Sequence, residues 1–281
     1  AARFYLLRVD YRQYPSYPQG YTIHLTLGAI AAGLGAVAVP ALIQKEYTAI
    51  TFLALAVQQF REVRKMERES LELLEDDELV KRGDAYIEDI SKKFEARNYV
   101  AMLTAIATTI GIYITKKVIW GVIIGIALLL FMAFFIKSKK IGHIAHVKAG
   151  HIHFEGPILM VDEIVISNVG LKKSRQKILD MAMAIVLIPK DDNARITLSN
   201  IGQRQAILHD VVSILGVRRE KDEPEFTPMA KRDPDNGNIA LLILTMEPDL
   251  EFAIEVVKRV SLLESSRKQP LDSYFGRKAA D

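Results

Sequence analysis

The stretch VIWGVIIGIALLLFMAFFI, residues 118–136, decides how the rest of this chain is interpreted. It carries no charged side chain, and it is about as long as the ~20 apolar residues that cross a ~30 Å hydrocarbon core. Lysines bracket it on both sides, at positions 116 and 117 before it and at 137, 139 and 140 after it. The core helix of a soluble protein is rarely both this long and lysine-capped, so the sequence predicts a transmembrane helix.

Three further apolar runs lie upstream, at residues 21–43, 47–60 and 98–115. Residues 98–115 are uncharged and are joined to the first span by only two lysines, which predicts a tight helical hairpin. Residues 47–60 are short, about 20 Å at 1.5 Å per residue. They either cross with their ends reaching for the interface, or enter halfway and continue as an amphipathic helix.

Small residues recur on one predicted face of the 21–43 helix, at Gly28, Ala32 and Gly35. Such residues let helix backbones approach closely in lipid, so we expect this face to pack on another helix. His24 lies near the start of the same run. Ionisable groups at membrane depth are costly and tend to mark pathways, but His24 is within a turn of the interface, where anchoring or helix–helix hydrogen bonding is the more frequent role.

The distribution of positive charge favours a crossing by residues 47–60. With that crossing, the arginines of residues 1–20, the basic residues of the insert 61–97 and the lysines of residues 137–140 all lie on one side. Cytoplasmic loops carry an excess of Lys and Arg, so this side is expected to be cytosolic. Residues 1–20 are then a cytosolic-edge segment that resembles the end of a truncated first helix, because the chain begins at Ala1 with an apolar run.

The insert 61–97 is dense in charges of both signs, with apolar residues at helical spacing. The pattern predicts one or two amphipathic cytosolic helices with a break near Gly83. Carboxylates cluster at residues 75–78 and again at Asp84, Glu88 and Asp89. Paired carboxylates can hold a cation or transfer protons, but in a mixed-charge helix they usually form a solvated face.

Several of these stretches resemble the YIEGIA family of bacterial membrane proteins: RVDYRQYPSYPQG at residues 8–20, AVAVPAL at 36–42, residues 51–60, and YIEDIS at 86–91. Tyr86, Ile87, Glu88 and Ile90 match the hexapeptide that names the family, whereas Asp89 and Ser91 replace its Gly and Ala. The resemblance covers nearly the whole chain. It implies a multi-pass membrane protein of endospore-forming Firmicutes with a link to sporulation or spore properties, and it implies no catalytic activity.

Residues 137–281 follow a different pattern, typical of a cytosolic α+β domain. Short β-branched runs at 158–169 and 182–189 predict strands, and residues 198–215 predict an amphipathic helix. Residues 238–246 predict a central strand, and a final helix follows at 248–264. The order β-β-α-β-α suggests a small α+β sandwich with a ferredoxin-like arrangement as one candidate, and residues after 269 read as a loose tail.

Four of the six histidines lie between residues 142 and 156: His143, His146, His151 and His153. Imidazoles at helical or strand spacing beside Glu155 could bind a divalent cation. The segment contains no HExxH motif, however, and it lies where the sequence predicts the junction between the membrane region and the domain. A solvated polar linker is therefore the simpler interpretation.

Composition and missing motifs limit the function. The chain has no cysteine, which excludes disulfides and Cys-based metal or nucleophile chemistry, and its net charge of +3 is too small to indicate nucleic-acid binding. Phosphate-binding loops, dinucleotide fingerprints, nucleophile elbows and kinase motifs do not occur. We expect a protein without enzymatic activity or cofactor, whose partners are the lipid bilayer, other membrane or spore proteins, or further copies of itself. The alternative is a transport or channel component.

Overall fold

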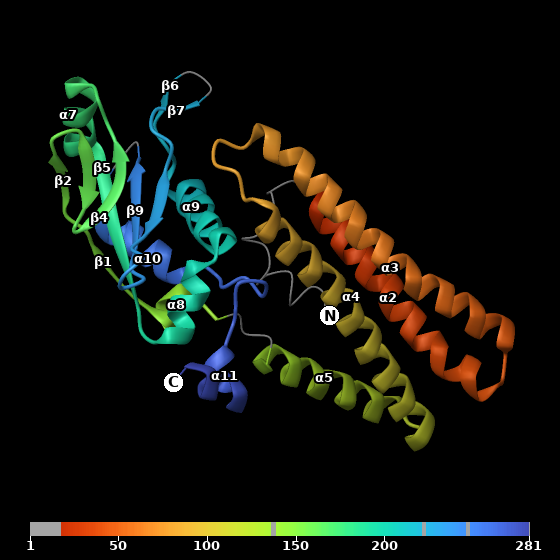
Figure 1. Cartoon of the computed structure of the whole chain (residues 1–281). Helices are drawn as coiled ribbons and strands as arrows, with labels where there is room; N and C mark the ends of the chain where they lie inside the picture. Colours follow the sequence, from red (N-terminus) through yellow and green to blue (C-terminus); the bar gives the residue numbers. More distant parts are fainter. Residues whose placement is uncertain (1–17, 136–138, 221–222, 246–247, 281) are drawn as a thin grey trace. The chain divides into compact units, whose positions relative to one another are not determined.

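The computed structural model describes residues 18–135, 139–220, 223–245 and 248–280 (Figure 1). The chain divides into two compact units. The helical unit comprises residues 1–71 and 88–137, and the α+β unit comprises residues 72–87 and 138–281. The predicted cytosolic-edge segment 1–20 lies outside the described residues up to position 17.

The helical unit is built from four long helices: α2 (Pro18–Ile43), α3 (Tyr47–Leu74), α4 (Asp84–Thr115) and α5 (Val118–Phe135). The predicted borders between spans and insert, at residues 60 and 97, fall inside α3 and α4 rather than at helix ends. Tight turns connect the pairs. Lys45 between α2 and α3 and Lys116 between α4 and α5 have φ values of 57° and 55°, a left-handed conformation that reverses the chain in few residues.

Small residues set the contacts among these helices. A Cβ on Gly35 of α2 would lie 2.3 Å from the carbonyl oxygen of Met102 in α4, so only glycine allows this approach. The predicted packing face is buried at Gly28 and Gly35 and half-buried at Ala32. Ala31, Phe60 and Ala101 form a small shared core of α2, α3 and α4.

The two helices of the α4–α5 hairpin also pack closely through glycines. Gly121 and Gly125 are spaced as in the small-xxx-small pattern of membrane helix pairs. A Cβ on Gly121 would lie 2.8 Å from the carbonyl oxygen of Thr108, and one on Gly125 would lie 2.7 Å from the Thr108 hydroxyl. The predicted helical hairpin is therefore present, with its close contact on glycines.

Two of the described helices are long and apolar enough to cross a membrane by length and composition, at Tyr21–Ile43 and Asp84–Thr115. Val118–Met132 of α5 is a shorter apolar helix. The chain is thus helical in its first half, with an α+β region at its C-terminal end.

The α+β unit contains a four-stranded antiparallel sheet in the order β1-β5-β9-β8 and a three-stranded antiparallel sheet in the order β2-β3-β4 (Figure 1). Its strands are β1 (Ala145–Ala149), β2 (Ile152–Glu155), β3 (Ile158–Val161), β4 (Ile164–Asn168), β5 (Ala182–Pro189), β8 (Met229–Arg232) and β9 (Ile239–Leu244), with the short pair β6 (Arg219–Glu220) and β7 (Glu223–Pro224). Its helices are η2 (Glu75–Asp77), α6 (Ile141–Ile144), α7 (Lys172–Met181), α8 (Asp192–Ser199), α9 (Ile201–Leu215), α10 (Leu250–Arg259), η3 (Pro270–Asp272) and α11 (Tyr274–Ala280).

The central strands β5 and β9 are buried on both faces, as their continuous apolar sequences predict. Ile185 and Leu241 face a core shared with α9 and α10, whereas Val186 and Leu242 face a second core shared with the β2-β3-β4 sheet and α7. The unit therefore has three layers, in the order helices, large sheet and small sheet. This order differs from the split β-α-β repeat of a ferredoxin-like fold, which the sequence offered as a candidate.

Two local features differ from the sequence interpretation. Residues 158–169, predicted as one strand, form the hairpin β3–β4, which turns at Asp162 with φ 50°. Residues after 269, predicted as a loose tail, form η3 and α11. The Asn193 amide on α8 donates to Asp272 at 3.0 Å and accepts from the Leu271 backbone at 3.4 Å, which ties η3 to the domain.

Candidate functional site at the 75–86 connector

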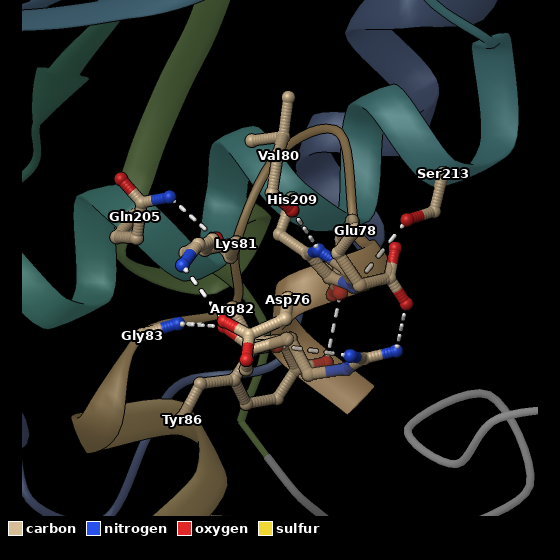
Figure 2. Close-up of polar contacts among 12 residues, drawn as sticks. Asp76, Glu78, Val80, Lys81, Arg82, Gly83, Tyr86, Gln205, His209 and Ser213 are labelled. Atoms are coloured by element: carbon tan, nitrogen blue, oxygen red, sulfur yellow. Dashed lines mark hydrogen bonds and ion pairs between the residues drawn. The ribbon is translucent and has the colours of Figure 1, made fainter. Parts of the chain in front are cut away.

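A connector of residues 75–86 lies along α9, although it precedes α9 by more than a hundred positions in the sequence (Figure 2). It begins with η2, continues as an irregular segment and turns at Gly83, which has φ 82° and a Cβ position 3.2 Å from Gln205 Cγ. It also contributes to the large core: Val80 is buried there, and Leu79 packs against it. The connector is thus part of the α+β unit.

A buried ion pair fixes the shape of the connector. The Arg82 guanidinium donates to Glu75 at 3.0 Å and to Glu78 at 2.8 Å, and the side chains of Arg82 and Glu75 are almost fully buried. The second Glu75 oxygen accepts the Gly83 backbone N–H at 3.0 Å. A charge taken out of water is tolerated only when its hydrogen bonds are replaced. Here both Glu75 oxygens have donors, so the loop is held in one conformation.

His209 of α9 binds the middle of the connector. Its Nδ1 lies 2.6 Å from the carbonyl oxygen of Val80, and its Nε2 lies 3.3 Å from the Ser213 hydroxyl (Figure 2). Because a carbonyl can only accept, Nδ1 carries the proton and the neutral ring accepts from Ser213. Burial lowers the pKa of His209, and the positive charge of Arg82 lowers it further. The hydrogen bond to Val80 and the charges of Glu78 and Glu75 raise the pKa but do not reverse the shift.

Four further contacts extend along α9. The Tyr86 hydroxyl donates to Asp210 at 2.7 Å, and its ring meets the His209 ring edge-on with centroids 6.0 Å apart. The Gln205 amide donates to the Lys81 carbonyl. Gly202 at the start of α9 approaches so closely that a Cβ would lie 2.4 Å from the Cβ of Ala85. The connector is therefore attached at intervals between Gly202 and Asp210 of α9.

The Ser213–His209 pair has the spacing of a nucleophile and its base. Its surroundings, however, favour a role in attaching the connector to α9. The His209 Nδ1 proton goes to a backbone carbonyl rather than to a carboxylate that would stabilise an imidazolium. Ser213 lies inside α9, where the neighbouring backbone N–H groups are used by the helix and cannot form an oxyanion hole. The arrangement fixes a loop on a helix.

The family-matching residues fall on both sides of the division between the units. Tyr86 and Ile87 belong to the α+β unit, and Glu88 and Ile90 to the helical unit. All but Glu88 are almost fully buried. Glu88 joins α4 to α3 through ion pairs with Arg64 and, at 3.8 Å, with Arg68. Three of these residues are therefore buried packing residues, and Glu88 forms ion pairs between two helices.

The two departures from the family hexapeptide are accommodated within α4. Asp89 and Ser91 are both buried. The Asp89 carboxylate lies 2.6 Å from the Lys93 ammonium one turn later, so the charge introduced where the family has glycine is paired. A helical position needs no glycine backbone freedom, which explains why the replacement fits.

The structure brings together two of the four histidines considered for a metal. The rings of His151 and His153 stack with centroids 5.6 Å apart. His143 in α6 accepts the Lys140 backbone N–H at 3.0 Å, and His146 lies in β1. Among the described residues, no group of three or more His, Cys, Asp or Glu side chains is placed to hold a metal ion.

Sequence reasoning did not find His209 or Arg82 as site residues. The connector is rich in charges of both signs, which is the usual pattern of a solvated helix face. Its partners lie on α9, and no local spacing connects the two segments. The available signal was the predicted break near Gly83, because glycine readily adopts the positive φ that a chain reversal needs.

Comparisons with known proteins cover both units. The sequence profile of the family described as YIEGIA protein matches residues 1–273. "Uncharacterized protein YphB" of Bacillus subtilis (strain 168) is 45% identical over 276 residues, which cover 97% of this chain and 91% of that protein. No solved structure matches the chain. Both similarities extend across the connector and α9.

Proposed function

The chain belongs to the YIEGIA family, and from that premise we propose that it is a multi-pass bacterial membrane protein with a cytosolic α+β domain. Its role is structural, in assembly or in regulation, and is connected with sporulation. The family resemblance supports the link to sporulation. The membrane arrangement is supported by the helices and by the order in which the chain passes between the two units.

The apolar surface of the helical unit supports a lipid environment. Only 22% of the most apolar 18-residue stretch of each candidate span is buried within the protein. Large side chains such as Val37, Ile114, Ile126 and Leu130 are more than half exposed. A core helix of a soluble protein would bury most of these side chains. Exposed apolar area on this scale is stable when lipid covers it.

The order in which the chain passes between the two units supports the proposed membrane topology. The chain leaves the α+β unit after residue 87, passes through α4 and α5, and re-enters the same unit at residue 138. Two segments of one folded unit must lie on one side of a membrane. The α4–α5 hairpin therefore crosses an even number of times, which two crossings with a turn at Lys116 satisfy. The lysines around residues 137–140 support a cytosolic location of the unit, because cytoplasmic loops carry an excess of positive charge.

Cysteine labelling tests this topology, because the chain has no native thiol. Lys117→Cys in the hairpin turn and Lys173→Cys on α7 are exposed positions. We expect a membrane-impermeant maleimide to label Lys117→Cys in intact cells and Lys173→Cys only after lysis. Labelling of Lys173→Cys in intact cells would overturn the orientation, and labelling of neither variant in lysed cells would indicate that the positions are covered.

A deletion strain tests the biological role. We expect loss of the gene to reduce the yield or resistance of spores while growth and solute uptake stay normal. Complementation with the wild-type chain should restore spores. Complementation with a Tyr86→Phe/His209→Ala variant, which removes the bonds to Asp210 and Val80, should restore them only partly. Normal spores in the deletion strain would refute the sporulation role and leave the topology untouched.

A second candidate, a transport component, rests on polar side chains buried in the helical unit. His24, Asn98 and Thr104 are at most 9% exposed. Within the described part of the chain, neither amide atom of Asn98 has a hydrogen-bond partner. Polar groups at membrane depth often mark a path for ions or solutes. Proteoliposomes loaded with a pH dye would detect a proton flux that disappears in Asn98→Leu; an unchanged leak would remove this candidate.

A further inference from the structure

Arg204 is a partly buried arginine whose N–H donors form only long hydrogen bonds or none. It lies in the first turns of α9, and its terminal nitrogens reach the carbonyl oxygens of Ala230 and Ser199 only at 3.5 Å, the long limit for a hydrogen bond. Its Nε is shielded from solvent and has no hydrogen-bond partner among the described residues. A guanidinium has five N–H donors, and leaving them unused in a buried setting is costly.

The charged neighbour of Arg204 is another arginine. Arg232 lies at the end of β8, the edge strand of the large sheet, and α9 packs on β8. Burial lowers the pKa of Arg204, and the positive charge of Arg232 lowers that pKa further. None of the ion pairs formed within the described residues involves either side chain. Two cations brought together without a carboxylate form an arrangement that an anion would stabilise.

The other hydrogen-bond donors near Arg204 and Arg232 already have acceptors within the protein. Arg195 on α8 donates to the Asp235 carbonyl at 3.1 Å, and its side chain lies against Gly237 in the turn between β8 and β9. The first-turn N–H of Gln203 is already capped by the Asn200 side chain at 3.0 Å. The attraction for an anion therefore comes from the two guanidinium groups and not from the helix end.

We propose that Arg204 and Arg232 form a binding site for a phosphate group between α9 and β8. A guanidinium presents parallel N–H donors that match two oxygens of a tetrahedral phosphate. The ligand would take up the unused Arg204 donors and neutralise the paired positive charges. The phosphate can belong to a soluble phosphate compound or to a lipid headgroup, since both offer the same oxygens.

Calorimetric titration of inorganic phosphate into the full chain, held in maltoside detergent micelles that contain no phosphate, tests the site. We expect saturable binding above a chloride background at equal ionic strength. Arg232→Ala should weaken binding about tenfold, as expected for loss of one bidentate charged contact. Arg204→Lys keeps the charge but loses the planar pair of donors and should weaken binding to a similar extent. Arg232 is exposed, so its variant is expected to fold.

Lys231→Ala provides the matched control. Lys231 precedes Arg232 on the same exposed strand but faces the opposite side, because side chains alternate along a strand. Its variant loses the same charge and should bind phosphate within about twofold of the wild type. The proposal fails if the wild-type chain gives no saturable phosphate signal, or if Lys231→Ala weakens binding as much as Arg232→Ala does.

Lipid composition identifies the source of the phosphate. In mixed micelles containing phosphatidylglycerol, a headgroup in the site would compete with inorganic phosphate and weaken its apparent affinity for the wild type. Unchanged affinity in those micelles would exclude this headgroup and favour a soluble phosphate compound as the ligand. Each result supports the site, and neither depends on the proposed role in sporulation.

Discussion

Burial of His209 couples its protonation to the stability of the α+β unit. Its pKa in the folded protein is lower than the ordinary 6.5, so at mildly acidic pH the unfolded chain binds a proton that the folded chain does not. The stabilisation by neutral His209 is therefore complete above about pH 6.5 and is lost as the pH falls below that value toward the folded-state pKa.

We accordingly expect the free energy of unfolding of the full chain to decrease from about pH 7 to about pH 5. His209→Gln can still bond to Val80 but cannot titrate, so it should flatten this dependence. Denaturant unfolding in detergent across this pH range provides the measurement. His151→Gln, which removes an exposed histidine, should leave the slope as in the wild type. An equal loss of slope in both variants would contradict the role of His209.

Arg82 offers a second test at the residue scale. Arg82→Ala leaves the buried Glu75 carboxylate with the Gly83 N–H but without its cation, and an unpaired buried charge costs about 3–5 kcal/mol. Replacing both partners, as in Arg82→Met/Glu75→Leu, should recover most of that loss because no charge remains buried. Chemical unfolding of the three chains gives the comparison. A double variant as unstable as Arg82→Ala would argue that the loss comes from packing rather than from charge.

At the scale of elements, two glycines of α2 form a matched pair. A Cβ on Gly35 would meet the Met102 backbone, whereas one on Gly33 would meet nothing within 4 Å. Gly35→Ala should therefore separate α2 from α4 and destabilise the helical unit by about 1–3 kcal/mol. Gly33→Ala should be neutral or slightly stabilising, because alanine favours the helix. Thermal unfolding in detergent distinguishes them, and equal effects would refute close packing at Gly35.

The elements with continuous or periodic apolar patterns could be predicted from the sequence. These include the helical hairpin, the buried strands β5 and β9, and the helices α9 and α10. Strands β1 and β2 were missed because their histidines and lysines resemble a polar linker. The β3–β4 hairpin was missed because it turns at Asp162 without a glycine or proline to mark the turn.

The candidate site could be predicted only in part. Tyr86 was named from its hexapeptide, but its partner Asp210 is 124 positions away, and no local pattern connects them. The same holds for His209 and Val80, which are 129 positions apart. Contacts of this range follow from how the sheet and its helices pack, and a single sequence does not contain that information in any local spacing.

At the scale of the whole molecule, the α+β unit is discontinuous and should not fold from its C-terminal part alone. A fragment of residues 138–281 lacks Val80 in the core and leaves His209 without its carbonyl partner. We expect this fragment to give a poorly dispersed amide NMR spectrum and to bind a hydrophobic dye. Adding a peptide of residues 72–87 should restore dispersion. A well-dispersed spectrum of the fragment alone would show that the connector is dispensable.

The position of the connector also has a consequence for biosynthesis. A ribosome makes residues 72–87 before the hairpin of α4 and α5, and it makes α9 only after both of those helices have left the exit tunnel. Until then the connector lacks its partners on α9. Its high content of Glu, Asp, Lys and Arg keeps it soluble during that interval. Under the proposed topology, the domain can be completed only after the hairpin has been made and inserted.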